Sequence, residues 1–479
     1  MQTALRDTAN VLRPPAPDAR GQRPGLFALV KALWNNPLEA WTSEHFERPI
    51  ILHDLHVGRI AIVSDPPSIR RVLNDNARNY RKDRFQHRML RALTGGILTA
   101  EGEQWRSQRS MFAPIFTPRT VRTLVPGMQA AVGALVARWQ ALDEGTVVDV
   151  ASEMVTLALE VLERTMFSDG FGQDIDRIRE AMRVFFDGIG RVDPMDFLGL
   201  PAFLPRFGRP GVRSATKLFD TAMDTMIAQR RQRLTEVTDA APRDMLTLLL
   251  RAQDPETGRG LSESDVRANV LTFMTAGHET TANAITWILY LLSQSQAWHR
   301  RVRAEVDREW DKLANGAEVK LPDLQAVVDE TLRLYPPLVA ISRAADNADE
   351  LAGHRIAPGA LVVVAPYVLH RHRLLWERPN HFDPTRFLPG QRETIDRYSY
   401  LPFGAGPRVC IGATFATQET LLAVASIVRH FDLELVPNHA VRPVHRVTLR
   451  PAGGLPMVLR KRQPAPSPAE RQAPALMTA

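Results

Sequence analysis

The only cysteine of the chain, Cys410, lies in the glycine-rich run FGAGPRVCIG (403–412), which an apolar helical pattern follows at once. A metal-bound thiolate is tuned by backbone N–H groups pointed at its sulfur, and glycines let the backbone approach that closely. The positive end of the following helix also favours the thiolate over the thiol. Arg408 adds a guanidinium that can bind a carboxylate. The run therefore predicts a metal-bound thiolate beside an anion site.

Two plainer interpretations of this run were weighed against that prediction. A dinucleotide-binding loop needs a third glycine, but Val409 stands at that position after Gly404 and Gly406. A structural turn with one buried cysteine is the other alternative, because a lone cysteine often behaves as a small apolar side chain. One cysteine cannot form an internal disulfide or a multi-cysteine zinc or iron–sulfur site, so those sites are excluded.

A second chemical pattern, AGHETT (276–281), lies inside a long helical segment. A mid-helix glycine and a threonine hydroxyl bonded one turn back can loosen a helix locally. An acid next to an alcohol can relay protons, so Glu279 and Thr280 are the candidate catalytic residues. A zinc-protease motif is excluded because Ala282 stands where the second histidine is required. A plain core helix with a polar turn remains the alternative.

Several arginines and one Glu–Arg pair complete the set of candidate residues. Glu330 and Arg333 are three residues apart, which places them on one helix face, although such pairs stabilise a protein little when they are exposed. The Tyr-Pro-Pro sequence that follows (335–337) ends this helix. Arg109, Arg343 and Arg408 are far apart in the sequence, but together they would suit a ligand with two negative charges.

Five motifs, in this order along the chain, resemble those of the cytochrome P450 family. They are WRSQR (105–109), AGHETT (276–281), ETLR (330–333), FDPTRF (382–387) and the cysteine run. The resemblance covers roughly residues 40–460 and implies a mainly α fold with a small β region and a long central helix over a haem.

The resemblance also implies a role for each candidate residue. Cys410 would be the axial ligand of the haem iron, with Ala276 and Gly277 facing the iron and the substrate. The other residues that the resemblance assigns to haem binding are Arg408, Trp105, Arg109, Arg343, Phe403 and Gly404. Glu330, Arg333 and Arg386 would form a buried network that holds the cysteine loop.

The implied activity is that of a monooxygenase, which uses haem b and O2 to oxidise a hydrophobic small molecule. Electrons would come from NAD(P)H through separate proteins, a ferredoxin or flavodoxin-type donor and its reductase. The matching pocket positions are Ile97, Thr272, Ala276 and Val339, which are mostly apolar. They leave fatty acids, terpenoids and aromatic compounds open as substrates.

Two rival functions remain open at this point. A peroxide-driven oxygenase or an isomerase would need no external electrons, but the intact Glu279–Thr280 pair speaks against it. A haem-binding gas sensor or carrier without catalysis is the second rival, and the sequence contains no recognisable signalling module.

Composition limits the kinds of partner. The 479-residue chain is 44% hydrophobic and 24% charged, with a net charge of +7, which is ordinary for a folded globular protein. Basic residues are spread among acidic ones, which argues against nucleic-acid binding. The arginines at 300, 301 and 303 could help to dock an acidic electron donor, although a solvated surface is the plainer interpretation.

The sequence also gives expectations about location and domain organisation. No uninterrupted stretch of about 18 apolar residues exists, and the start shows no signal peptide, so we expect a cytoplasmic protein without a membrane anchor. We also expect a monomer. An organelle transit peptide is the alternative. We expect a mobile segment at residues 1–24, a single domain at 25–462 and a disordered tail at 463–479.

The periodicity of apolar residues predicts the elements that must position these groups. A β-hairpin is expected over 50–63, with further strands at 361–364 and near 455–459. Helices are expected over 128–142, 151–166, 215–234, 262–293, 324–335 and 413–428. Ser262, three residues before Asp265, predicts the start of the longest helix.

Overall fold

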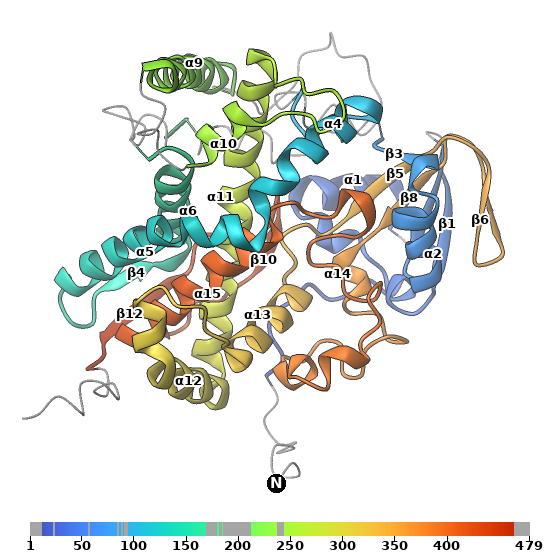
Figure 1. Cartoon of the computed structure of the whole chain (residues 1–479). Helices are drawn as coiled ribbons and strands as arrows, with labels where there is room; N and C mark the ends of the chain where they lie inside the picture. The colour runs from blue at the N-terminus through green and yellow to red at the C-terminus, as the bar shows by residue number, and fades with distance from the viewer. Residues whose placement is uncertain are drawn as a thin grey trace, which may run out of the picture.

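The computed structural model describes residues 12–22, 24–55, 58–83, 86–87, 90, 94–168, 180–181, 184, 212–236 and 244–463. Helices dominate and the strands are short, so the predicted mainly α fold with a small β region is confirmed (Figure 1). The helices are α1 (Leu26–Asn35), α2 (Pro66–Arg70), α4 (Gly102–Phe112), α5 (Pro118–Ala141), α6 (Val150–Met166), α9 (Val212–Glu236), α10 (Met245–Arg251), α11 (Glu263–Gln294), α12 (Gln296–Ala314), α13 (Pro322–Leu334), α14 (Pro366–Leu369) and α15 (Ala413–His430).

The long helix α11 runs through the centre of the molecule (Figure 1). It begins where the sequence predicts, because the Ser262 hydroxyl accepts a hydrogen bond of 3.1 Å from the backbone N–H of Asp265. Its 32 residues span roughly 48 Å at 1.5 Å per residue. Apolar side chains occur on nearly all of its faces, and it packs against α6, α13 and α15. A helix that is apolar on all sides is stable only when other elements surround it.

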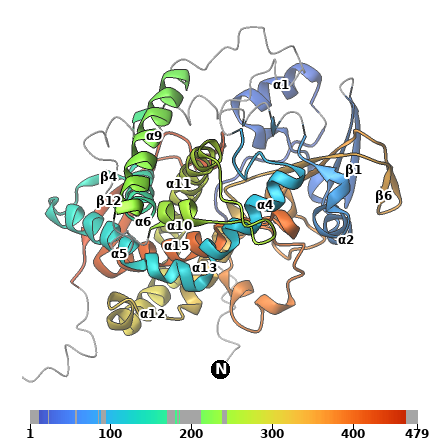
Figure 2. The ribbon, with the colours of Figure 1, turned by 45° about the horizontal axis from the view of Figure 1, so that its top comes forward.

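A five-stranded sheet stands to one side of the helices (Figures 1 and 2). Its strand order is β1 (Ile50–Leu55), β2 (Gly58–Val63), β8 (Leu361–Val364), β5 (Ile341–Ala345) and β3 (Tyr80–Arg81). The predicted hairpin over 50–63 is confirmed as β1 and β2, and the predicted strand at 361–364 is confirmed as β8. Residues of β3 pair with β5 in antiparallel register, which brings Lys82 beside Arg343.

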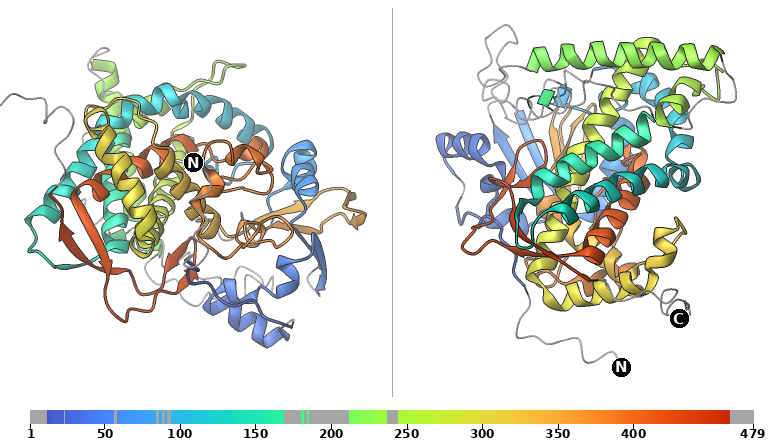
Figure 3. Two further views of the ribbon diagram at one scale, coloured as in Figure 1. Left: turned by 90° about the horizontal axis from the view of Figure 1, so that it is seen from below. Right: turned by 90° about the vertical axis from the view of Figure 1, so that its left-hand side faces the viewer.

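A second sheet lies at the opposite end of the molecule (Figures 1 and 3). It contains β4 (Val147–Asp149), β12 (Pro456–Lys461) and β9 (Phe431–Leu435), so the predicted strand near 455–459 is confirmed. The described residues also form two small hairpins. They are β6 (Asp349–Leu351) with β7 (His354–Ile356), and β10 (Pro443–His445) with β11 (Leu449–Pro451).

The predicted helix over 128–142 is wrong at its start, because α5 begins ten residues earlier at Pro118. Pro126 lies inside the helix, where proline removes one helical hydrogen bond. Burial of Val121, Leu124 and Met128 in the core outweighs that loss. By length and composition α5 is also apolar enough to cross a membrane, but its packing against α6 and α15 accounts for these apolar residues.

The remaining predicted helices are confirmed with ends shifted by no more than a few residues, as α6, α9, α13 and α15. Part of the N-terminal segment contacts the body of the protein. The carbonyl of Leu12 accepts a 2.9 Å hydrogen bond from Phe382 N–H, and the carbonyl of Pro15 accepts one of 2.8 Å from the Tyr335 hydroxyl. Residues 1–11 and 464–479 lie outside the described residues, so the division into domain and tails stays a prediction.

Candidate active site around Cys410

The loop that carries Cys410 is held in a tight turn by its own backbone. The Cys410 N–H donates a 2.9 Å hydrogen bond to the carbonyl of Phe403. Gly404 and Gly406 have φ angles of 73° and 71°, in the left-handed region that favours glycine. A Cβ on Gly406 would also lie 1.8 Å from the carbonyl oxygen of Leu73, so only glycine fits there. The loop thus requires glycines where the sequence has them.

Opposing influences act on the Cys410 thiol. Burial raises its pKa, while a hydrogen bond from the backbone N–H of Gly412 and the charge of Arg109 lower the pKa. The side chain is nevertheless accessible to solvent. Helix α15 begins at Ala413 and directs its N-terminus toward this turn. A cation bound at the sulfur would overcome the effect of burial and hold the thiolate.

One stretch of α11 is open, although most of this helix is buried. Ala276 is exposed and Thr280 is half-buried, whereas residues 269–275 and 281–292 are buried. The Thr280 hydroxyl donates a 2.6 Å hydrogen bond to the carbonyl of Ala276, one turn back. Gly277 differs from the expectation that it faces the iron, because a Cβ there would meet Leu162 of α6 at 3.2 Å. The open face of α11 is therefore that of Ala276 and Thr280.

The Glu279 carboxylate has a partner on β11. Glu279 is buried, and one of its carboxylate oxygens accepts a 3.4 Å contact from Nη1 of Arg450 on β11. The Arg450 side chain is about one-third exposed, so this pair connects the buried carboxylate with the solvent side of the protein. Sequence analysis missed Arg450, because no pattern along the chain relates a residue of β11 to the middle of α11.

Four basic side chains gather beside the cysteine loop. Arg408 donates to the Ala100 carbonyl at 3.1 Å and to the Glu101 carboxylate at 2.6 Å, and its guanidinium lies 4.4 Å from the centre of the Trp105 ring. Arg109, one turn after Trp105 on α4, donates to the Val409 carbonyl at 3.0 Å. Trp105 and Arg109, which the resemblance assigns to haem binding, therefore lie against the cysteine run.

Arg343 and Lys82 form the other side of this cluster. Burial, followed by the charge of Arg408, lowers the pKa of Arg343 to about 10 and that of Lys82 to about 7. Sequence analysis missed Lys82, because its proximity to Arg343 depends on the pairing of β3 with β5. Glu101 and, more weakly, Asp83 supply the nearby negative charge that acts on Arg343.

These groups fit a haem. A planar cofactor with two propionates needs a ligand for its iron and cations for its carboxylates. Cys410 supplies an accessible sulfur, and the cationic cluster carries more positive charge than Glu101 and Asp83 neutralise. The lowered pKa values of Lys82 and Arg343 reflect buried cations, which an added anion would stabilise.

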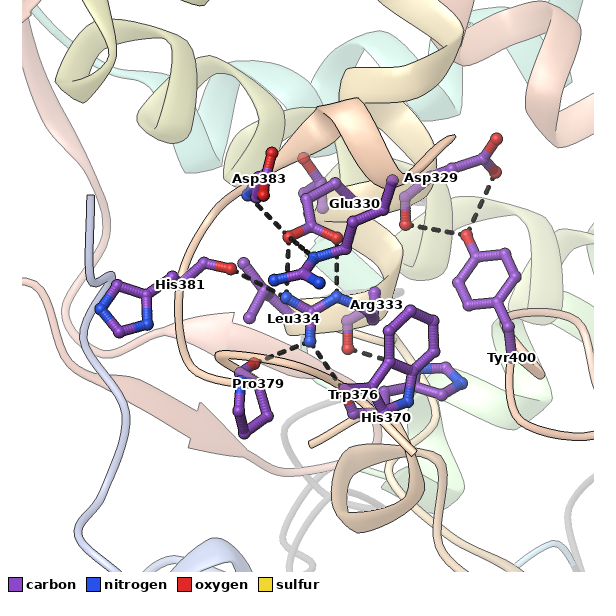
Figure 4. A network of polar contacts seen from close by, with 12 residues as sticks. Asp329, Glu330, Arg333, Leu334, His370, Trp376, Pro379, His381, Asp383 and Tyr400 are labelled. Atoms are coloured by element: carbon purple, nitrogen blue, oxygen red, sulfur yellow. Dashed lines mark hydrogen bonds and ion pairs between the residues drawn. The ribbon is translucent and has the colours of Figure 1, made fainter. Parts of the chain in front are cut away.

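The predicted pair Glu330–Arg333 lies on α13 and is fully buried, with both side chains 0% exposed (Figure 4). Arg333 donates to the two carboxylate oxygens of Glu330 at 2.6 and 2.7 Å. It also donates to three backbone carbonyls, those of His370, Pro379 and His381, at 2.7–2.9 Å. The Glu330 carboxylate further accepts a 2.8 Å bond from Asp383 N–H.

Arg386 joins this network more loosely than the sequence pattern suggests. Its Nε lies 3.6 Å from Glu330 Oε1, and its side chain is 13% exposed. The three residues assigned to the structural network are therefore together in space. Their contacts bind α13 to the segment that leads into the cysteine loop.

Of the four predicted pocket residues, three are buried and one is exposed. Ile97 is buried, and its N–H donates to the Asn269 side chain of α11 at 2.8 Å. Thr272 packs tightly under Gly96 and donates its hydroxyl to the Ala268 carbonyl at 2.7 Å. Val339 is buried beside the start of β5, and Ala276 is the exposed member of the set.

An accessible thiol in a glycine turn, beside a cluster of cationic side chains, is the arrangement expected of a haem-thiolate protein. A family model described as Cytochrome P450 matches residues 25–455, and the chain belongs to this family. The predicted family is confirmed.

Curated relatives agree with this assignment. The chain is similar to cyclooctat-9-en-7-ol 5-monooxygenase of Streptomyces melanosporofaciens, with 32% identity that covers 94% of this chain and 97% of the relative. It is also similar to pentalenene oxygenase of Streptomyces avermitilis, with 30% identity over 90% of this chain and 94% of the relative. The crystal structure of a cytochrome P450 (CYP102L1) covers 94% of this chain and 99% of its own, with a TM-score of 0.77 and 26% identity.

Membership in the family defines the general activity. The chain is a haem monooxygenase that uses haem b and O2, with electrons from NAD(P)H delivered through a redox partner. Its substrate is a hydrophobic small molecule. The predicted enzyme class and cofactors are confirmed.

Proposed function

We propose that Cys410 is the axial ligand of the haem iron and that the chain oxidises a largely apolar small molecule. The observation that carries this proposal is the accessible Cys410 sulfur in its glycine turn. Burial raises the pKa of this thiol, and the Gly412 N–H and the charge of Arg109 act against that increase. When bound, the haem supplies the activation of O2 from which one oxygen atom enters the substrate.

The cationic cluster holds the haem carboxylates in this proposal. Arg408 and Arg109 bind from the side of the cysteine loop and α4, with the Trp105 ring packed against Arg408. Arg343 and Lys82 bind from the sheet. Phe403 and Gly404 support the ring from the loop, where the Gly404 backbone approaches closely, and Ala276 contacts it from α11.

Thr280 and Glu279 deliver protons to the open face of α11. The Thr280 hydroxyl already donates to the Ala276 carbonyl, so its oxygen can accept a further hydrogen bond from water on that face. The Glu279 carboxylate pairs with Arg450, which is partly exposed to solvent. A change in the Glu279 rotamer would carry a proton from this pair toward Thr280. Glu330, Arg333 and Arg386 take no part in chemistry and hold the cysteine loop in place.

Ile97, Thr272, Ala276 and Val339 are proposed to contact the substrate. Apolar side chains predominate among them, and the Thr272 hydroxyl is already bonded to its own helix, so recognition rests on shape and burial of apolar surface. Relatives named for cyclooctat-9-en-7-ol and pentalenene favour a cyclic, largely hydrocarbon substrate over a charged one.

We propose a ferredoxin or flavodoxin-type donor with its own reductase as the redox partner, and a cytoplasmic monomer as the working form. Among the arginines expected at the docking surface, Arg301 pairs with Asp323 at 2.6 Å and Arg303 pairs with Asp432. Arg300 is exposed and better suited to meet an acidic partner.

A substrate screen that follows the haem spin state tests the proposal. Apolar cyclic compounds should shift the spectrum and then turn over with NAD(P)H, a ferredoxin and its reductase. Thr280→Ala should divert electrons to hydrogen peroxide while leaving ligand binding intact. Equal turnover with peroxide alone would instead support a peroxide-driven enzyme, and binding without any turnover would support a carrier.

A further inference from the structure

His370 lies directly after α14 and beside Arg333 of the buried ion pair (Figure 4). Its ring also contacts Leu401, in the chain that leads to the cysteine loop. It is 0% exposed. Burial, together with the nearby positive charge of Arg333, lowers its pKa to about 3, so the imidazole is neutral in the working range of the protein. The roles proposed above do not use this residue.

The partners of His370 fix the tautomer of its ring. A backbone N–H can only donate, so Nε2 must accept the 2.8 Å hydrogen bond from Leu401 N–H. A carbonyl can only accept, so Nδ1 must carry the proton and donate to the Arg333 carbonyl, 3.2 Å away. A neutral ring with its proton on Nδ1 is the form that satisfies both contacts.

The contact with α13 is reciprocal. While the His370 ring donates to the Arg333 backbone, the Arg333 guanidinium donates to the His370 carbonyl at 2.7 Å. His370 is thereby held at both its backbone and its side chain. Its remaining ring nitrogen is directed at Leu401 in a fixed position.

Two backbone hydrogen bonds connect Leu401 with Cys410. The Leu401 carbonyl accepts a 3.2 Å bond from Gly404 N–H, and the Phe403 carbonyl accepts the 2.9 Å bond from Cys410 N–H. These hydrogen bonds, joined by the backbone of Leu401 and by the Phe403–Gly404 peptide, connect α13 through the imidazole to Cys410. A shift of Leu401 would change the direction in which the sulfur points.

We infer that His370 is a positioning residue, which fixes the cysteine loop to the helix of Glu330 and Arg333 through both nitrogens of its ring. This inference rests on the proposed ligation of the haem iron by Cys410. It adds a specific connection between the buried ion pair and the thiolate. Loss of the connection should weaken thiolate ligation before it weakens the fold.

A pair of variants with matched side-chain length tests the inference. His370→Gln keeps one acceptor and one donor, about as far apart as the ring nitrogens, whereas His370→Met has a similar length and neither strong group. The measurement is the lifetime of the red-shifted Soret band of the reduced carbon monoxide complex in urea too dilute to unfold the protein. Haem content and helical circular dichroism are followed in parallel.

Met should shorten the lifetime of the red-shifted band by about tenfold, which corresponds to ~1.4 kcal/mol. Gln should remain within about threefold of the wild type. The helical signal and the haem content should outlast the band in the Met variant. If all three signals instead fall together, His370 supports the fold in general and the inference is overturned.

Thr331→Val is the control on the same helix. Its buried hydroxyl donates to the Val327 carbonyl at 2.7 Å, a hydrogen bond that lies wholly within α13. This variant should lower the midpoint of urea unfolding. When it is compared with the wild type at equal free energy of unfolding, the lifetime of its red-shifted Soret band should not be shorter. An equal shortening in Thr331→Val would overturn the inference.

Two further outcomes separate this inference from the proposed function. If the Met variant is recovered without haem, the Gln variant decides: a persistent band supports the inference, and a second loss of haem overturns it. If the wild type itself lacks the red-shifted band, the proposed ligation by Cys410 fails. A wild type with the band and a Met variant with an unchanged lifetime refutes the role of His370 alone.

Discussion

Replacing Glu330 with Gln perturbs the buried ion pair while leaving its shape almost unchanged. Arg333 would keep its bonds to the three backbone carbonyls but lose the charged partner of its 2.6 and 2.7 Å contacts, inside a site that is 0% exposed. Removing one partner of a buried pair costs about 3–5 kcal/mol. The whole stability of a domain is about 5–15 kcal/mol, so the loss is a large share of it.

A matched surface pair provides the comparison. Glu103 and Arg106 have the same three-residue spacing and a similar contact of 2.5 Å, but their side chains are 78% and 59% exposed. An exposed pair stabilises a protein by about 0–1 kcal/mol, so Glu103→Gln should change little. Urea unfolding and haem content are measured for both variants. Equal shifts of the urea midpoint would refute the reasoning that burial determines the importance of the pair.

Three further predictions follow from the structure. Gly406→Ala should abolish haem incorporation, because its Cβ would overlap the Leu73 carbonyl. Gly404→Ala has a similar φ but its Cβ would lie 3.7 Å from the nearest atom, so urea unfolding should show a loss of only about 1–2 kcal/mol. Equal effects of the two variants would contradict this prediction. Burial lowers the pKa of His278 from 6.5 to about 4. Between these two pH values the histidine is protonated in the unfolded chain but neutral in the folded protein. The free energy of unfolding should therefore fall as the pH is lowered from 7 to 4, and in His278→Gln this fall should be smaller by about 3 kcal/mol. Urea unfolding at both pH values measures the difference. The same pH dependence in the variant and the wild type would refute the prediction. Lys82→Met should speed the transfer of haem to a haem-free acceptor protein by about tenfold or more, because it removes the proposed charged hydrogen bond to a haem carboxylate. An unchanged transfer rate would exclude Lys82 from the haem site.

The sequence predicted those elements whose formation depends on local periodicity and capping. The start of α11 followed from the Ser262 cap, and α13 and α15 followed from their apolar faces. The start of α5 did not, because burial of apolar side chains on both sides of Pro126 carries the helix through a residue that usually ends one.

The chemistry-bearing motifs were visible in the sequence, but their connections were not. Lys82 meets Arg343 only through the register of β3 and β5, and Arg450 reaches Glu279 only because β11 folds back onto α11. Gly277 turns toward α6 although its neighbour Ala276 is open, a difference of one residue on the helix surface. Through-space contacts of this kind depend on packing, which a linear pattern does not encode.

The electronic spectrum of the reduced protein under carbon monoxide tests the central claim most directly. Thiolate ligation by Cys410 predicts a red-shifted Soret band in the wild type, and Cys410→Ser should lose that band. A folded, pigmented wild type without the shift would contradict the account. So would a Cys410→Ser variant whose spectrum matches that of the wild type.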